Sequence, residues 1–149
     1  MEEEQKEDVK EEIDYDIRWK QRFNYYTKAF GRLTEAITII KNEPNHFLLQ
    51  AGLIQTFEYT FELGWKTLKD YLESEGFHVS SPKHAIRKAF QCGFISDAKP
   101  WLKALNDRNM MSHSYYEDVS LHVVSEIQNK YYDQLKELHE WLGNLVTQD

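Results

Sequence analysis

Cysteine, glycine and proline are all scarce in this 149-residue sequence, which has one, six and three of them. The single cysteine, Cys92, excludes an internal disulfide and a cysteine-rich zinc site, and it is typical of a reducing compartment. The glycines are scattered singly, so no glycine-rich loop could cradle a nucleotide phosphate. Asp118, His122 and Glu126 share a helical face, but no further histidine completes a metal shell. We expect neither a metal nor a cofactor.

Long hydrophobic runs and strand patterns are missing as well. No apolar stretch is long enough to cross a bilayer, and the N-terminus opens with glutamates where a signal peptide has a basic patch and an apolar run. We therefore expect a cytoplasmic protein without a membrane partner. No segment alternates apolar and polar residues as a strand does. Hydrophobic residues are nevertheless 41% of the chain and aromatic residues 14%, which indicates a folded core.

Positive charge is missing from the N-terminus. Residues 1–16 hold nine acids and two bases, so the net charge of −7 lies there and residues 17–149 are neutral. Because this acidic tail has no apolar periodicity, it is predicted to be disordered. Bases outnumber acids between Ser81 and His113, where six bases face two acids, and a polyanion could bind there. The six are Lys83, Arg87, Lys88, Lys99, Lys103 and Arg108.

Apolar residues recur every three or four positions, the spacing of one helical face. The pattern predicts helices over 17–41 and 46–75, a short helix capped by Ser81, a fourth capped by Ser96 or Asp97, and a last over 118–145. The predicted fold is therefore all-α, an antiparallel up-and-down bundle of four or five helices that spans residues 17–145.

The segment 46–75 is apolar around most of its circumference and leaves only one polar stripe, which includes Glu58 and Glu62. A helix of this kind is buried on more than one side. In so small a domain the second side is best covered by another subunit, and we predict a homodimer.

The stretch RNMMSHSYYED, residues 108–118, gathers polar chemistry where the fourth helix ends and the last begins. Arg108 and His113 are five positions apart, which places them about 140° around an ideal helix. They can meet in two ways. Either the helix ends before His113, or the site is assembled across a dimer axis from both chains.

These residue types suit metal-free cleavage of RNA. Histidine can transfer protons near neutral pH, and arginine presents a fixed positive fork to phosphate oxygens. A symmetric pair of His113 side chains could supply both acid and base. Asn109, Ser112 and Tyr115 are then candidates for substrate contact, together with Lys103 of the basic segment, and Glu58 or Glu62 could orient Arg108.

A purely structural interpretation remains open on spacing alone. Arg108 could pair with Asp107 or Glu117, and His113 could lie against the dipole at the end of the fourth helix. Ser114 could cap the last helix.

Residues 108–115 also fit the R-x4-H-x-Y pattern of HEPN-domain proteins of the HepT type, with a polar residue after the arginine. Three segments around the pattern resemble the branch of that family called nucleotidyltransferase substrate-binding proteins. They are LIQTFEYTFELGWKTLKDYLESEG (53–76), SPKHAIRKAF (81–90) and WLKALNDRNMMSHSY (101–115). The resemblance covers residues 17–142 in order, and the acidic tail is not part of it.

The resemblance implies a dimeric helical bundle with two motifs in a shared cleft, and a small nucleotidyltransferase as its partner in a toxin–antitoxin pair. It implies a metal-independent endoribonuclease with Arg108 and His113 as catalytic residues. It also implies silencing by transfer of AMP to Tyr115. The alternative function is a non-catalytic subunit that binds RNA or nucleotide as the substrate for the transferase.

Overall fold

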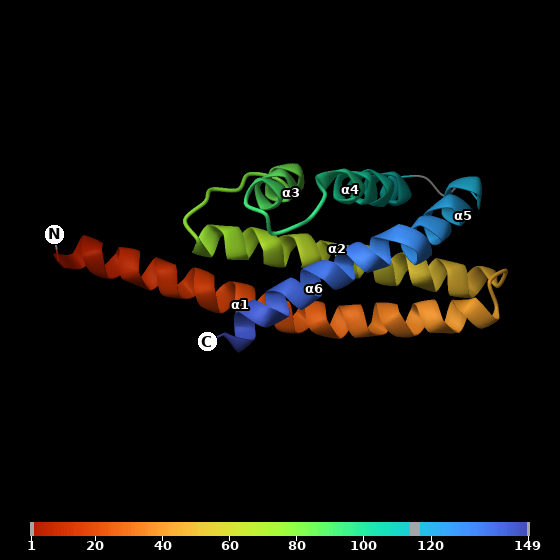
Figure 1. Ribbon diagram of the computed structural model, residues 1–149, viewed down its shortest axis with the longest axis horizontal. Coiled ribbons are helices and arrows are strands. Elements are labelled where there is room, and N and C mark those ends of the chain that lie inside the picture. The colour runs from red at the N-terminus through yellow and green to blue at the C-terminus, as the bar shows by residue number, and fades with distance from the viewer. Residues whose placement is uncertain (1, 114–116, 149) are drawn as a thin grey trace.

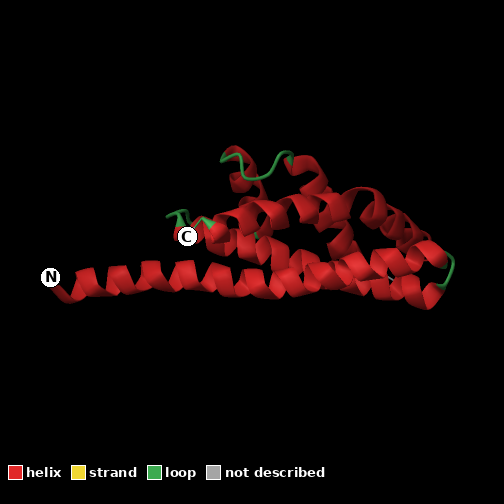
Figure 2. Cartoon of the chain, turned by 60° about the horizontal axis from the view of Figure 1, so that its bottom comes forward, coloured by secondary structure: helices red, strands yellow, loops and turns green. Residues whose placement is uncertain are grey.

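The computed structural model describes the backbone of residues 2–113 and 117–148, and the side chains of residues 14–111 and 121–148. Every regular element in this part of the chain is a helix (Figure 2). The elements are α1 (Glu2–Asn42), α2 (Phe47–Ser74), α3 (Pro82–Gln91), α4 (Ala98–His113), α5 (Glu117–Glu126), the π-helix η1 (Ile127–Tyr131) and α6 (Tyr132–Thr147). The predicted all-α bundle is confirmed.

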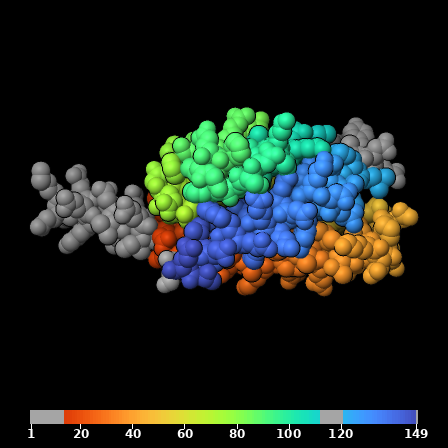
Figure 3. All heavy atoms as spheres, viewed as in Figure 1, coloured from red at the N-terminus to blue at the C-terminus, as the bar shows by residue number. Residues whose placement is uncertain are grey.

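The two longest helices, α1 and α2, form an antiparallel hairpin (Figure 1). The α5–η1–α6 stretch runs back along this hairpin and packs against both of its helices, while α3 and α4 lie along the other side of α2. Side chains of α6 close the face between α4 and α1 in Figure 3. Because α2 has neighbours on several sides, most of its circumference is apolar, as the sequence predicts.

The core lies where α2 meets α1 and α6. Its largest fully buried side chains include Tyr26, Phe57, Phe61 and Tyr131. The Tyr26 hydroxyl donates to the backbone carbonyl of Leu135 at 2.5 Å, so this buried phenol is satisfied. Burying a large apolar side chain contributes about 1.5–3 kcal/mol, so these aromatic residues stabilise the fold together with the buried aliphatic residues around them.

The helix ends follow the local chemistry of the sequence. The Ser81 hydroxyl accepts from the His84 backbone N–H at 3.1 Å, and Pro82 occupies the first turn, where its missing N–H is tolerated. Of the two caps considered for α4, Asp97 takes the role, because its Oδ1 accepts from the Lys99 backbone N–H at 3.0 Å. Gly93 follows α3 with φ of 79°, a backbone conformation that favours glycine.

Two helices differ from the sequence-based prediction. α1 begins at Glu2, whereas disorder is predicted for residues 1–16 and a helix from residue 17. Glutamate, lysine and glutamine are good helix formers, and no proline or glycine interrupts them in residues 1–16. The helix therefore extends to Glu2 (Figure 1), although this part of the sequence has no apolar periodicity. The predicted single helix over 118–145 contains the π-helical segment η1. One inserted residue widens a turn there, which apolar periodicity does not reveal.

Candidate functional site

The guanidinium of Arg108 joins α4 to α2. Its Nη2 lies 2.5 Å from Oε2 of Glu62, and both side chains are about one quarter exposed, at 28% and 26%. Among the described residues, Glu62 is thus a carboxylate partner of the arginine, as one of the sequence-based alternatives proposed. Because the ion pair is partly shielded from water, it fixes the guanidinium more firmly than a surface pair would.

Glu62 is held by two further donors from its own helix. Trp65 Nε1 donates to Oε2 at 3.0 Å, and Lys66 Nζ lies 3.0 Å from Oε1. Burial alone would raise the pKa of Glu62, but the hydrogen bonds from Trp65 and Lys66, with the positive charges of Arg108 and Lys66, hold that pKa below its ordinary value. The carboxylate is thus ionised at neutral pH and gives Arg108 a fixed anchor.

A second carboxylate, Glu58, lies one helical turn before Glu62. Burial raises the pKa of Glu58 above its ordinary value, and the positive charge of Arg108 opposes this shift only in part. The pKa values of these two carboxylates are therefore shifted in opposite directions. Glu62 accepts hydrogen bonds from direct donors, which lower its pKa, whereas burial is the main influence on Glu58.

Asp107, next to Arg108, points into the bundle. The Tyr131 hydroxyl donates to Asp107 Oδ2 at 2.5 Å, and the aspartate side chain is almost fully buried. Burial, followed by the neighbouring Asp107 carboxylate, raises the pKa of Tyr131 well above its ordinary value, so the tyrosine remains a proton donor. His122 Nε2 lies 4.0 Å from the same oxygen. The hydrogen bond between Tyr131 of η1 and Asp107 of α4 fixes the position of α4 one residue before Arg108.

The other predicted site residues of α4 lie in different directions. Asn109 is exposed, and its Oδ1 accepts from Arg108 Nη1 at 3.4 Å, so it adjoins the arginine. Lys103 does not reach this cluster. Its Nζ lies 3.2 Å from Glu126 Oε2, where Lys130 also contacts the carboxylate at 3.6 Å. Part of the positive charge predicted for the segment between Ser81 and His113 is therefore neutralised within the fold.

The last turn of α4 contains Ser112 and His113 as backbone, and their side chains lie outside the described part of the structure. Tyr115 also lies outside the described residues. Because α4 continues through His113, the geometry in which the helix ends before His113 is wrong. On the backbone of an ideal helix, positions 108 and 113 are about 140° apart.

Sequence reasoning missed the bond between Asp107 and Tyr131. Tyr131 carries the spacing of a core residue, and no local pattern distinguishes a core tyrosine from one that bonds a distant aspartate. A charged residue on the buried side of α4 was the available signal, because a buried carboxylate requires a partner.

The fold is a helical hairpin covered by further helices, with an arginine of α4 anchored on α2. This arrangement can now be compared with known protein families. Residues 21–144 match the family described as nucleotidyltransferase substrate binding protein like, and the chain belongs to that family. This confirms the resemblance seen in the sequence. Among the described residues, no helix has the length and apolar character needed to cross a membrane.

Three relatives illustrate the family. A Haemophilus influenzae protein named probable ribonuclease HepT is 28% identical over 122 residues, which cover 72% of this chain and 83% of the relative. A crystal structure of a Thermus thermophilus protein is 32% identical, with a TM-score of 0.68, and the match covers 80% of this chain and 98% of that one. A Haemophilus influenzae structure described as the fold of a substrate binding domain of a nucleotidyltransferase is 26% identical, with a TM-score of 0.72 and the same coverage.

Proposed function

We propose that this chain is a metal-independent endoribonuclease of the HEPN type, active as a homodimer and controlled by a small nucleotidyltransferase. The observation that carries the proposal is the anchored guanidinium of Arg108, held by Glu62 at the side of α4 that faces α2. An arginine whose position is fixed before substrate arrives can stabilise a phosphorane-like transition state without reorganising. The relative named probable ribonuclease HepT supports the same activity.

The helical geometry supports the proposed dimer. Backbone positions 108 and 113 of one α4 are about 140° apart, and we propose that a site using both residues is assembled from two chains. The first turn of α2 supplies apolar surface for such contact, because Phe47 and Leu48 are 72% and 61% exposed. We assign the dimerising domain to residues 17–145, with the acidic residues 1–16 outside it.

The proposed chemistry needs a base, an acid and positive charge. One His113 takes the proton of the ribose 2′-hydroxyl, and the 2′-oxygen attacks phosphorus. The bond from phosphorus to the 5′-oxygen breaks, and His113 from the second copy donates a proton to that leaving oxygen. The products are a 2′,3′-cyclic phosphate and a 5′-hydroxyl. Arg108 offsets the charge on the phosphoryl oxygens, and Asn109, Ser112 and Lys103 are proposed to contact RNA.

Regulation is proposed to act on Tyr115. The partner nucleotidyltransferase would transfer AMP from ATP to the tyrosine oxygen, with loss of the hydroxyl proton and release of pyrophosphate. The added group is anionic and bulky, and would exclude RNA from the cleft. The family description and the Haemophilus influenzae structure support a nucleotidyltransferase as the partner.

The test is cleavage of cellular RNA by the purified full chain in EDTA, beside Arg108→Ala and His113→Ala, with intact mass reported for each protein. We expect the unmodified chain to leave cyclic-phosphate ends, and both variants to lose cleavage while they stay dimeric. Mixing the two variants should not restore the activity, because a mixed dimer keeps only one His113 and the proposed chemistry uses the histidines of both copies.

The second candidate is a non-catalytic subunit that presents RNA or nucleotide to the transferase, which the family description favours. If the unmodified chain leaves RNA whole but binds the transferase equally well with or without His113, the second candidate replaces the first.

A further inference from the structure

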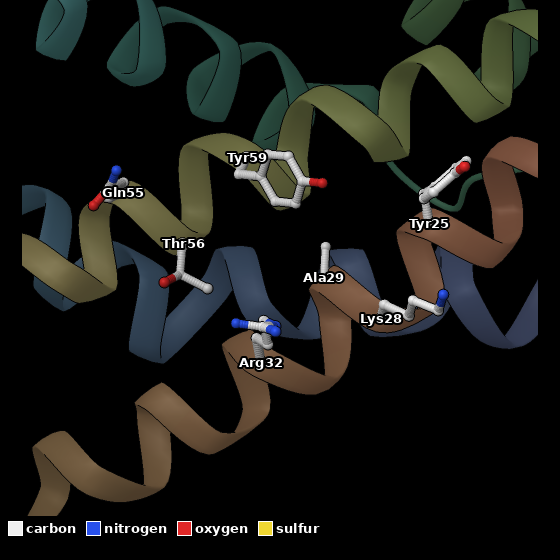
Figure 4. A pocket seen from close by; sticks show the side chains of 7 residues that line it. All are labelled: Tyr25, Lys28, Ala29, Arg32, Gln55, Thr56 and Tyr59. Carbon is white, nitrogen blue, oxygen red and sulfur yellow. The ribbon is translucent and has the colours of Figure 1, made fainter.

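A hollow of about 470 Å³ lies between α1 and α2, away from the α4 side of the bundle (Figure 4). We call it the α1–α2 groove. Tyr25, Lys28 and Arg32 come from α1, and Gln55, Thr56 and Tyr59 come from α2. A volume of this size is within the usual range for small-ligand sites, which is about 300–1,000 Å³.

The groove is positively charged in a chain whose net charge is −7. Lys28 and Arg32 are exposed, and no carboxylate is among the residues that line the groove in the described structure. Lys28 Nζ lies 5.9 Å from the centre of the Tyr25 ring, on the α1 wall. This lining favours an anionic occupant.

Two tyrosines add flat apolar surface to this charge. Tyr25 is 59% exposed and Tyr59 is 58% exposed, and they come from opposite walls of the groove (Figure 4). Exposed aromatic rings beside cations are the combination by which proteins hold single-stranded nucleic acid, because bases stack on the rings while the cations meet the phosphates. The Gln55 amide, on the same wall as Tyr59, has both donors and an acceptor for a base edge.

The α2 wall of the groove lies close in sequence to Glu62, the residue that anchors Arg108. Tyr59 and Glu62 are three positions apart on α2, so they occupy neighbouring rows of the same helix. A strand whose scissile phosphate meets Arg108 can therefore pass over the outer surface of α2 and reach Tyr59 without leaving the protein.

We infer that the α1–α2 groove binds a segment of the single-stranded RNA substrate, with bases on Tyr25 and Tyr59 and backbone phosphates on Lys28 and Arg32. This inference rests on the proposed ribonuclease function and extends it with a second contact region beyond the motif.

The test measures binding of a short, fluorescein-labelled single-stranded RNA to the full chain in a His113→Ala background, which keeps the RNA whole. Tyr59→Ala and Tyr25→Ala should each weaken binding by about 5- to 150-fold, the range for losing one base stacked on an aromatic ring. The matched control Tyr59→Phe should stay within about twofold, because stacking needs only the ring.

The charge contribution is measured separately. Arg32→Gln should reduce the slope of log affinity against log salt concentration by about 0.7, as expected for one phosphate contact to a single strand. Lys136→Gln is the matched control, because Lys136 is an exposed base on α6 outside the groove. In the wild-type background, the groove variants Tyr25→Ala, Tyr59→Ala and Arg32→Gln should raise KM for RNA cleavage more than they lower kcat.

Each contrary outcome has a separate meaning. If the His113→Ala parent binds RNA and the groove variants bind it equally well, the groove inference is overturned and the proposed function stands. If the groove variants dissociate the dimer by mass measurement, the surface is an interface between copies and the inference is again overturned. Absence of both binding and cleavage in the unmodified chain overturns the proposed function together with the inference.

Discussion

Arg108 Nη2 lies 2.5 Å from Glu62 Oε2, across the interface between α4 and α2. The same glutamate oxygen accepts from Trp65 Nε1 at 3.0 Å, and the other oxygen contacts Lys66. The arginine of the family motif is therefore oriented by a carboxylate 46 positions away in the sequence. A residue of α2, a segment that carries part of the family resemblance, therefore positions the α4 arginine to which we assign a catalytic role.

Replacing Glu62 tests this anchor. Glu62→Gln keeps the shape of the side chain but removes its charge, so Arg108 should leave its present position and RNA cleavage should fall by about 10- to 100-fold, as expected for a misplaced catalytic group. Structure determination and single-turnover kinetics would measure the two effects. Glu73→Gln is the matched control, because Glu73 pairs with Lys69 on the same helix without touching the motif. An unmoved Arg108 in the Glu62→Gln structure would contradict the positioning role.

Tyr131→Phe tests the bond that fixes α4 from η1. The substitution leaves the buried Asp107 carboxylate without its tyrosine donor, so the free energy of unfolding should fall by about 1–3 kcal/mol in urea titrations. Tyr132→Phe is the neighbouring control, because the Tyr132 hydroxyl shares a neutral, partly buried hydrogen bond with Thr34. This variant should lower the free energy of unfolding by only about 1 kcal/mol. Equal losses in the two variants would show that Asp107 does not depend on Tyr131.

Gly64 allows α2 to approach the aromatic core. A Cβ at this position would lie 3.3 Å from Tyr26 Cε2 and 3.4 Å from Leu135 Cδ2, and Tyr26 cannot retreat because its hydroxyl is bonded to the Leu135 carbonyl. Gly64→Ala should therefore lower the free energy of unfolding by about 1–2 kcal/mol despite its higher helix propensity. Gly52→Ala, in the same helix with open space around it, should raise stability by up to about 1 kcal/mol. Thermal and urea unfolding would show whether the two variants change the free energy of unfolding in opposite directions.

His139 predicts how stability depends on pH. Its ring stacks 5.1 Å from the rings of Phe23 and Phe30, and burial lowers its pKa below the ordinary 6.5. Below pH 6.5 the unfolded chain binds a proton at His139 more readily than the folded chain does. The contribution of His139 to the free energy of unfolding is therefore complete above pH 6.5. It is lost as the pH falls from there toward the lowered pKa of the folded chain. In urea titrations from neutral to mildly acidic pH, His139→Gln should show a smaller decline than wild type. His78→Gln, which replaces a histidine outside this aromatic stack, should keep the wild-type decline.

The acidic start of α1 is predicted to lie outside the folding unit. Deleting residues 2–13 removes seven acids and two bases but keeps Asp16, which accepts from Trp19 Nε1 at 3.0 Å. We expect the free energy of unfolding to change by less than about 0.5 kcal/mol and RNA affinity to increase, because fewer carboxylates repel the phosphates. A marked loss of stability would place these residues inside the domain.

Local chemistry determined most of the helices. Apolar spacing predicted α2, Ser81 and Pro82 predicted the start of α3, and Gly93 predicted its end, because caps and backbone preferences act within a few residues. The same reasoning missed η1, since a π-helix follows from the bonds that a helix makes with its surroundings. It also predicted a helix beginning at residue 17, because periodicity reports burial and an unburied helix has none.

The sequence by itself determined the fold class, the family and the residues to examine, because periodicity, caps and a spaced motif are written locally. Only the tertiary structure placed Glu62 against Arg108, since Asp107, Glu117, Glu58 and Glu62 were all compatible with the sequence. It also decided that α4 continues through His113, where a helix end before that residue was one of the two geometries considered. The contact between Glu62 and Arg108 depends on how α2 and α4 lie relative to each other, and packing between distant segments is a property of the folded chain that no local pattern contains.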